Sequence, residues 1–272
     1  MPDQESKYTE EPNPVSCPPQ RPLAPAWHTV LLIAGILAIS IAGKMQLAHA
    51  HHLPNRLMTY GTTAAMEMLL FGWVAFGLRL GRTPLRSLFG AVGKGARAVF
   101  IDLGIAGAVW IVSLVVLGTM GLLWTSVDVA VSQWHRSDHG GPAGAVASRH
   151  QESLRVVEQL APSSGTEIAG WVMLCGLAGM IEEVVFRGYL QSQFAAWTNG
   201  GMAWGVALSA LLFGAAHGYQ GIRNMFLLVV FGVLFSVLAI RRRNLRAGIF
   251  AHGWHDLISG LVLTFLRSHH LL

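Results

Sequence analysis

The sequence is poor in charge and has only two cysteines. Asp, Glu, Lys and Arg make up 12% of its 272 residues, whereas a soluble domain has about 25%. This shortage excludes an ordinary soluble globular domain. It also makes the net charge of +5 a weak indicator of nucleic-acid binding, and we predict no nucleic-acid partner. Cys17 and Cys175 are too few for a disulfide framework or a cysteine zinc site.

The N-terminal segment lacks a basic stretch that leads into a cleavable apolar core. Residues 1–26 are instead polar and rich in proline, which is typical of a disordered tail and not of a signal peptide. The rest of the chain contains apolar windows of about 20 residues, the length that crosses a bilayer as a helix. We therefore predict an all-α, polytopic membrane bundle of about seven transmembrane helices.

These apolar windows divide the chain into three further parts. We predict spans one to three within residues 27–124, a polar loop at 125–166, and a four-helix core at 167–272 that contains spans four to seven. The predicted spans are residues 27–43, 57–78, 99–124, 167–197, 203–217, 222–240 and 247–266. The fourth should continue to Trp197, because Asn199, Gly200 and Gly201 follow it as a helix stop.

Two short connections concentrate the basic residues, at 79–97 and at 241–246. With seven spans and a cytoplasmic N-terminus, both lie on the cytoplasmic side, as the positive-inside rule requires. We expect an integral membrane protein in contact with lipid. From Leu85 to Val99 the first connection has an apolar and a basic face. It is either an amphipathic helix in the membrane interface or an ordinary loop.

Ionisable side chains stand at the end of the apolar run that forms the fourth span. Glu182 and Glu183 follow Ile181, and Arg187 lies one helical turn beyond Glu183, so Glu183 and Arg187 can pair. Glu182 points roughly 100° away from Glu183 on a helix. Ionisable groups within a membrane span indicate a functional site, although both glutamates could also be solvated at a helix end.

Two later spans carry histidine. His217 ends the fifth run, after Phe213 and three small residues, and His252 and Asp256 share one face of the seventh. Each could be a packing or hydrogen-bonding residue only. Glu67, in the second span, is interpreted as a glutamate bonded to a neighbouring helix, because no motif surrounds it.

Taken together, these residues suit two kinds of hydrolytic chemistry. Histidines and carboxylates can hold a catalytic zinc that keeps one position open for water. The metal ligands would then be Glu182, His217, His252 and Asp256. Alternatively, a glutamate and a histidine activate water without a metal, and His252 and Asp256 stabilise the oxyanion.

The three motifs Glu-Glu-x-x-x-Arg, Phe-x-x-x-His and His-x-x-x-Asp, in that order on apolar helices, resemble those of the CPBP intramembrane protease family. That family includes CAAX prenyl proteases of the Rce type and bacteriocin-processing and immunity proteins. The resemblance covers residues 165–266. The matching residues are Glu182, Glu183, Arg187, Phe213, His217, His252 and Asp256. Asp256 stands where many members carry Asn.

The resemblance implies a hydrolase, an intramembrane metalloprotease that cleaves a membrane-associated peptide or protein, prenylated or small. It implies that Glu182 activates water with help from His217, that His252 and Asp256 complete a metal or oxyanion site, and that Glu183 and Arg187 support them. A divalent metal, zinc first, is the expected cofactor. The alternatives are a transporter, or a scaffold that binds a peptide without cutting it.

Overall fold

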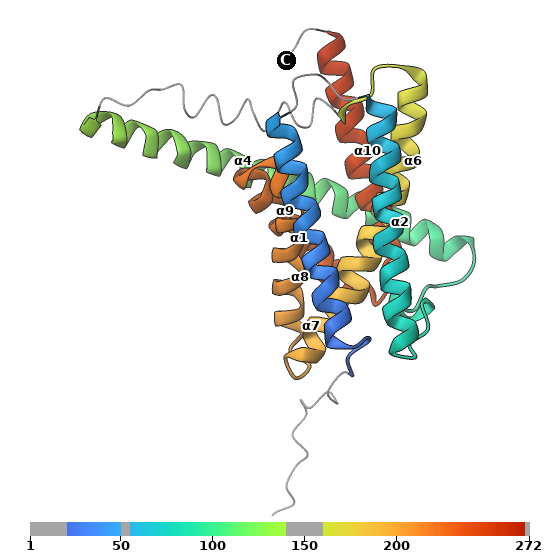
Figure 1. Cartoon of the computed structure of the whole chain (residues 1–272). Coiled ribbons are helices and arrows are strands. Elements are labelled where there is room, and N and C mark those ends of the chain that lie inside the picture. Colours follow the sequence, from blue (N-terminus) through green and yellow to red (C-terminus); the bar gives the residue numbers. More distant parts are fainter. Residues whose placement is uncertain (1–20, 50–54, 140–159, 270–272) are drawn as a thin grey trace, which may run out of the picture.

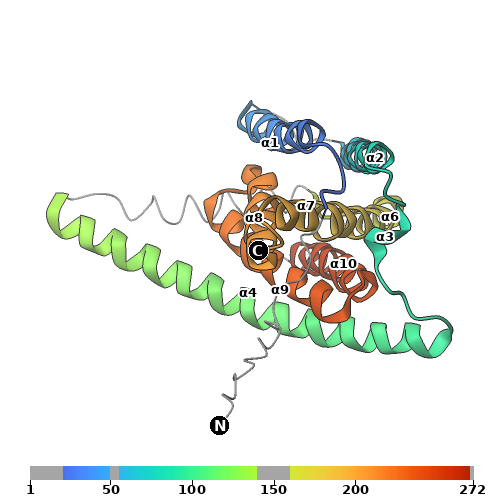
Figure 2. The same ribbon diagram turned by 90° about the horizontal axis from the view of Figure 1, so that it is seen from below.

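The structure is a computed structural model that describes residues 21–49, 55–139 and 160–269, and these form an all-helical bundle. Helices α1 (Ala26–His49) and α2 (Arg56–Leu80) lie side by side along one face (Figure 2). Behind them stand α6 (Gly165–Glu182), η1 (Glu183–Leu190), α7 (Gln191–Trp197) and α8 (Met202–Ala216). Next come α9 (Ile222–Arg242) and α10 (Arg246–Ser268), and α4 (Ala96–His139) crosses the far side. The predicted helical membrane bundle is confirmed.

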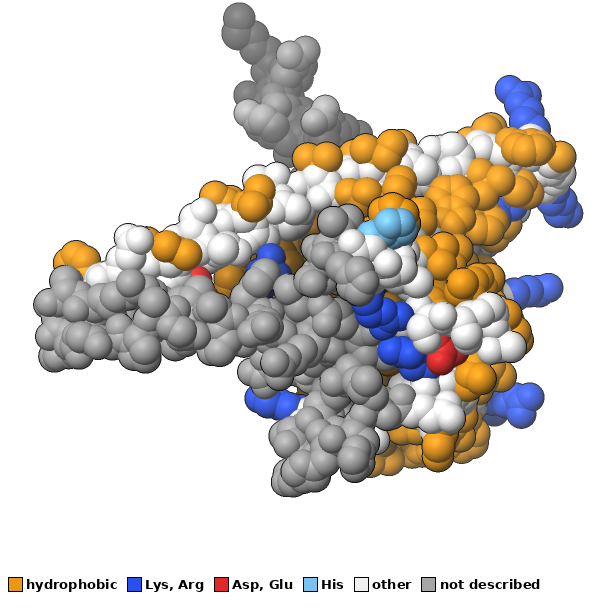
Figure 3. Space-filling view, turned by 90° about the horizontal axis from the view of Figure 1, so that it is seen from above, with side chains coloured by type: hydrophobic (Ala, Val, Ile, Leu, Met, Phe, Trp, Pro, Cys, Tyr) orange, Lys and Arg blue, Asp and Glu red, His pale blue; other side chains and the backbone are white. Residues whose placement is uncertain are grey.

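Six helical segments of the described chain are long and apolar enough to cross a membrane, one fewer than predicted. The exception is α8, whose 15 residues extend about 22 Å, less than the roughly 30 Å of a hydrocarbon core. Large apolar side chains, such as Met173 at 76% and Leu122 at 72% exposure, face outward. Figure 3 shows apolar groups along the flanks of the helices, as expected of a lipid-facing surface.

The two basic connections meet at one end of the bundle. The Ala91 amide donates to the Arg243 carbonyl at 2.9 Å, and the Leu245 amide donates to the Phe89 carbonyl at 3.2 Å. Beside them, the buried Asp102 carboxylate accepts hydrogen bonds from Arg242 and Arg246. Both connections therefore lie on the same side of the bundle, which is the arrangement that the positive-inside argument requires.

The amphipathic helix considered for residues 85–99 does not form. The structure has a single turn, α3 (Arg86–Phe89), followed by irregular chain up to α4. The reason lies in Gly90 and Gly95, whose φ angles of 73° and 81° belong to the left-handed region that ends a helix. The alternative prediction, an ordinary loop, holds for most of this stretch.

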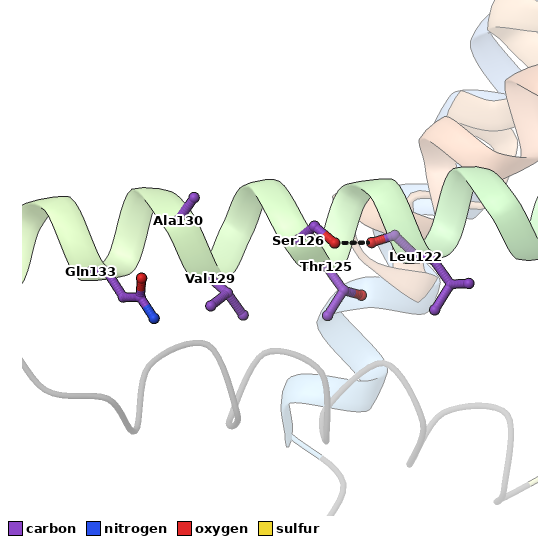
Figure 4. Close-up of a pocket in the computed structure, with 6 residues that line it drawn as sticks. All are labelled: Leu122, Thr125, Ser126, Val129, Ala130 and Gln133. Atoms are coloured by element: carbon purple, nitrogen blue, oxygen red, sulfur yellow. Dashed lines mark hydrogen bonds between the residues drawn. The ribbon is translucent and has the colours of Figure 1, made fainter.

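Helix α4 continues beyond the predicted end of the third span, through the first part of the predicted polar loop, to His139 (Figure 1). The rest of that loop, 140–159, lies outside the described residues. A shallow hollow of about 400 Å³ runs along this extension (Figure 4). Its lining residues are Leu122, Thr125, Ser126, Val129, Ala130 and Gln133. They carry no ionisable group, so we assign no chemistry to the hollow.

The end of the predicted disordered tail is packed against the bundle. The Gln193 side chain accepts hydrogen bonds from the amides of Leu23 and Ala24 and donates one to the Ala24 carbonyl at 2.7 Å. Ala24 is only 3% exposed. For residues 21–25 the prediction of disorder was wrong, because a buried glutamine satisfies their backbone groups. Residues 1–20 lie outside the described chain.

Candidate active site

The paired glutamates stand where a long helix changes its winding. Glu182 is the last residue of α6, and Glu183 is the first of the π-helical segment η1, which leads into α7. A π-helical turn inside an α-helix often marks a functional site. As predicted, the combined helix ends at Trp197, and Asn199 and Gly200 follow with φ angles of 55° and 84°. Such left-handed residues terminate helices.

Glu183 is the centre of a buried ionic cluster. Its Oε1 lies 3.0 Å from Nη1 of Arg187 and 2.9 Å from Nδ1 of His252, which belongs to α10. The Glu183 and Arg187 side chains are 0% and 1% exposed. The Arg187 guanidinium also lies 4.3 Å from the centre of the Phe213 ring, a cation–π distance. The predicted pairing of Glu183 with Arg187 is present, and His252 joins it.

His252 connects Glu183 to the other two carboxylates. Its Nε2 lies 3.7 Å from Oε2 of Glu182 and 3.7 Å from Oδ2 of Asp256. The predicted spacing of His252 and Asp256 on one helical face is therefore confirmed. Five of the six predicted site residues thus gather around one imidazole, although they come from two helices that are far apart in the chain.

This arrangement requires that α6 and α10 approach closely, and glycines permit it. A Cβ on Gly179 would lie 2.8 Å from the Gly253 amide nitrogen, and a Cβ on Gly248 would lie 3.2 Å from Oε2 of Glu183. Small residues at such positions let membrane helices pack backbone to backbone. These glycines therefore set the distance across which His252 meets the glutamates.

We expect Gly179→Ala to destabilise the protein by about 1–3 kcal/mol, the usual cost of overpacking. We also expect it to lower peptide cleavage, because the new methyl group pushes α10 away from Glu182. Gly176→Ala is the matched control, since nothing lies within 4 Å of a Cβ there. Thermal unfolding in detergent and cleavage rates measure both variants. Equal behaviour of the two would contradict this role of Gly179.

His217 lies at the end of the short helix α8. It is the C-cap residue, and its Nδ1 lies 2.9 Å from the Phe213 carbonyl oxygen. Since a carbonyl only accepts, Nδ1 carries the proton of this bond. Ser40 of α1 fixes the next turn, because its hydroxyl donates to the Ala215 carbonyl and accepts from the Gly218 amide. His217 is partly buried and lines a cavity.

A cavity of about 780 Å³ joins His217 to Glu182. Its walls come from α1 and α2 on one side and from α6, η1, α8 and η2 (Gly218–Gln220) on the other. Glu182 and His217 both line it. One part of its wall is apolar, with Ile36, Ile39, Met66, Leu70, Val185 and Phe186. Another part is polar, with Ser40, Gln46, Thr59, Thr62 and Thr63.

The structure does not test the predicted zinc. Within the described ranges, no three or more His, Cys, Asp or Glu side chains come close enough together to be identified as a metal-binding group. His252 and His217 bond Glu183 and the Phe213 carbonyl through Nδ1, which leaves Nε2 of each ring as the nitrogen that could bind a metal. Zinc therefore stays a prediction.

The structure places Glu67 in the cavity, whereas the sequence led us to predict only a bond to a neighbouring helix. It lies on α2 and lines the same cavity as Glu182 and His217. No hydrogen-bond partner within the described chain reaches its buried Oε2, so the expected bond to a neighbouring helix is absent for that atom. A signal was available: Thr59, Thr63 and Glu67 recur every four residues and so share one helical face.

Comparison with known proteins agrees with this geometry. Residues 164–258 match the family described as type II CAAX prenyl endopeptidase, Rce1-like. No curated protein and no solved structure matches the chain. The matched residues run from the start of α6 to just beyond Asp256, and so they contain the ionic cluster and His217. Over these residues the chain is therefore similar to membrane CAAX-type endopeptidases of the Rce1-like family.

Proposed function

We propose that the protein hydrolyses a peptide bond of a membrane-associated substrate, with a prenylated peptide as the first candidate. The observation that carries this proposal is that Glu182 and His217, from different helices, line one cavity of about 780 Å³. A carboxylate and an imidazole on a common cavity wall are the two groups that activation of water needs. The Rce1-like match supports the same class of reaction.

Glu182 is the proposed base. The side chain lines the cavity, and its buried Oε2 has no hydrogen-bond partner within the described chain, so no protein group competes with a water for this carboxylate. The water oxygen then attacks the carbonyl carbon of the peptide. With Nδ1 of His217 bound to the Phe213 carbonyl, Nε2 is the nitrogen left for the reaction. Nε2 can accept a hydrogen bond from the same water and so help Glu182 to activate it.

We assign His252 the role of a positioning residue. It is 3% exposed, and its Nε2 is 3.7 Å from Glu182, so the ring can orient the base without reaching the substrate. The other ring nitrogen, Nδ1, is hydrogen-bonded to Glu183, which fixes the ring, and Arg187 forms an ion pair with Glu183. Asp256 adds a second carboxylate beside the same Nε2.

The cavity wall suits a substrate with a polar and an apolar part. Hydroxyl and amide side chains on α1 and α2 can hydrogen-bond a peptide backbone, and the apolar side chains can contact a hydrocarbon chain. Helices α1 and α2 form the outer wall of the cavity. A substrate that is already dissolved in the membrane therefore reaches the cavity with little transfer through water. We further propose that the end carrying both basic connections faces the cytoplasm, in a bacterial inner membrane.

Cleavage is expected to survive removal of divalent metal, because in the proposed step Glu182 and His217 activate the water without a metal. The test uses the purified full chain in nanodiscs and a farnesylated peptide with a fluorophore and a quencher on either side of the scissile bond. Initial rates are measured before and after dialysis against phenanthroline. Metal content is measured in parallel by mass spectrometry.

A loss of the rate on chelation, recovered by added Zn²⁺, would contradict the metal-free mechanism and support the predicted zinc site. Absence of cleavage for both the farnesylated and the unmodified peptide would contradict the proposed function itself. Mass spectrometry of the products identifies the bond that is cut.

A further inference from the structure

The second carboxylate in the cavity, Glu67, requires an explanation that the proposed mechanism does not give. It is contributed by α2, outside residues 164–258, so the matched family segment does not contain it. Its Oε2 is buried and has no hydrogen-bond partner in the described chain. An unpaired carboxylate in such a place is costly when ionised. A residue with only a structural role is easily replaced by an apolar one of similar volume.

The position of Glu67 suits a carboxyl group that carries a proton. Glu182 of α6 and Tyr219 of η2 line the same cavity, and Nε2 of His252 lies 3.7 Å from both Glu182 and Asp256. Two carboxylates in one apolar site are not both ionised readily. Because the buried Oε2 of Glu67 has no hydrogen-bond partner in the described chain, we place the proton on Glu67.

We propose that Glu67 is a second catalytic carboxyl group of this site, the acid that protonates the leaving amine. This inference rests on the proposed function. In the step, Glu182 takes a proton from water as the hydroxide oxygen bonds to the carbonyl carbon. The C–N bond then breaks, and its electron pair takes the proton of the Glu67 carboxyl group. The proton on Glu182 returns to Glu67 through water, so one water is consumed and both glutamates are restored.

The geometry of α2 is consistent with this role. Thr59, Thr63 and Glu67 lie on the face of α2 that lines the cavity, and Met68 on another face is 52% exposed. A peptide that hydrogen-bonds to the threonine hydroxyls would pass Glu67 on the same face. The acid therefore reaches the substrate from α2, whereas the base belongs to α6. An acid and a base from two helices that line one cavity can serve the two proton transfers.

The test compares Glu67→Gln with wild type on two substrates. One is the farnesylated quenched peptide, and the other is the same peptide with an ester in place of the scissile amide. An alkoxide leaves with less need of a proton than an amine does. We expect Glu67→Gln to lower kcat about 10²-fold on the amide and much less on the ester. We also expect the alkaline fall in kcat, where the acid loses its proton, to disappear.

Glu167→Gln is the matched control, because it makes the same change on α6 outside the cavity, where Glu167 bonds Ser163. Glu67→Leu is the second variant, and we expect it to fold with an unchanged or raised melting temperature and to lose amide cleavage. Equal losses of Glu67→Gln on amide and ester, or an unchanged kcat, would overturn the inference. If Glu182→Gln also keeps its activity, the proposed function fails as well. If Glu182→Gln is inactive, the failure concerns Glu67 alone.

Discussion

Glu182→Gln is expected to lower the kcat for peptide cleavage by about 10⁴-fold, near the upper end for loss of one acid–base group. The amide has nearly the shape of the carboxylate but cannot accept a proton from water. The Glu182 side chain is 14% exposed and borders the cavity, so it is not a buried support of the helices. We therefore expect the thermal unfolding temperature to change little. Cleavage rates and unfolding in the same nanodiscs measure both quantities.

The comparison with Glu167→Gln separates the chemical role from a general effect of lost charge. Glu167 lies in the first turn of the same helix and accepts hydrogen bonds from the Ser163 amide and hydroxyl. Its variant should cleave the peptide at the wild-type rate. A Glu182→Gln enzyme that kept a rate within about tenfold of wild type would be incompatible with Glu182 as the base.

Unlike Glu182→Gln, the variant Glu183→Ala should cause a large loss of stability. Arg187 is 1% exposed and lies 3.0 Å from the Glu183 carboxylate, so the substitution leaves a buried guanidinium without its ion pair. Breaking a fully buried pair in this way costs about 3–5 kcal/mol. The Nδ1 of His252 loses its acceptor as well. Thermal and denaturant unfolding of the purified variant measure the loss, and activity falls with the folded fraction.

The double variant Glu183→Ala/Arg187→Met tests the cause. With the buried charge removed, an apolar side chain can pack against Phe213 and Phe235, which now flank the guanidinium. We expect it to recover part of the stability that Glu183→Ala loses, although not the position of His252 or the activity. No recovery would mean that the loss comes from the cavity at residue 183 and not from the unpaired arginine.

The contrast between these adjacent glutamates was only half visible in the sequence. Their different directions follow from helical geometry, and so does the pairing of Glu183 with Arg187. The sequence could not show which carboxylate would be buried. That depended on α10, whose Gly248 lies against Glu183 and whose His252 bonds it.

The sequence alone determined the helical membrane bundle, the end of the fourth span and the residues of the ionic cluster, because hydropathy, helix stops and four-residue spacing are local properties. Tertiary structure decided the rest. Helix α8 ends inside the bundle, so that His217 reaches a cavity instead of a surface. Glu67 lies far from every motif along the chain and joins Glu182 only because α2 packs along α6. Contacts between residues distant in sequence depend on which helix faces pack against each other, and no local sequence pattern specifies this packing.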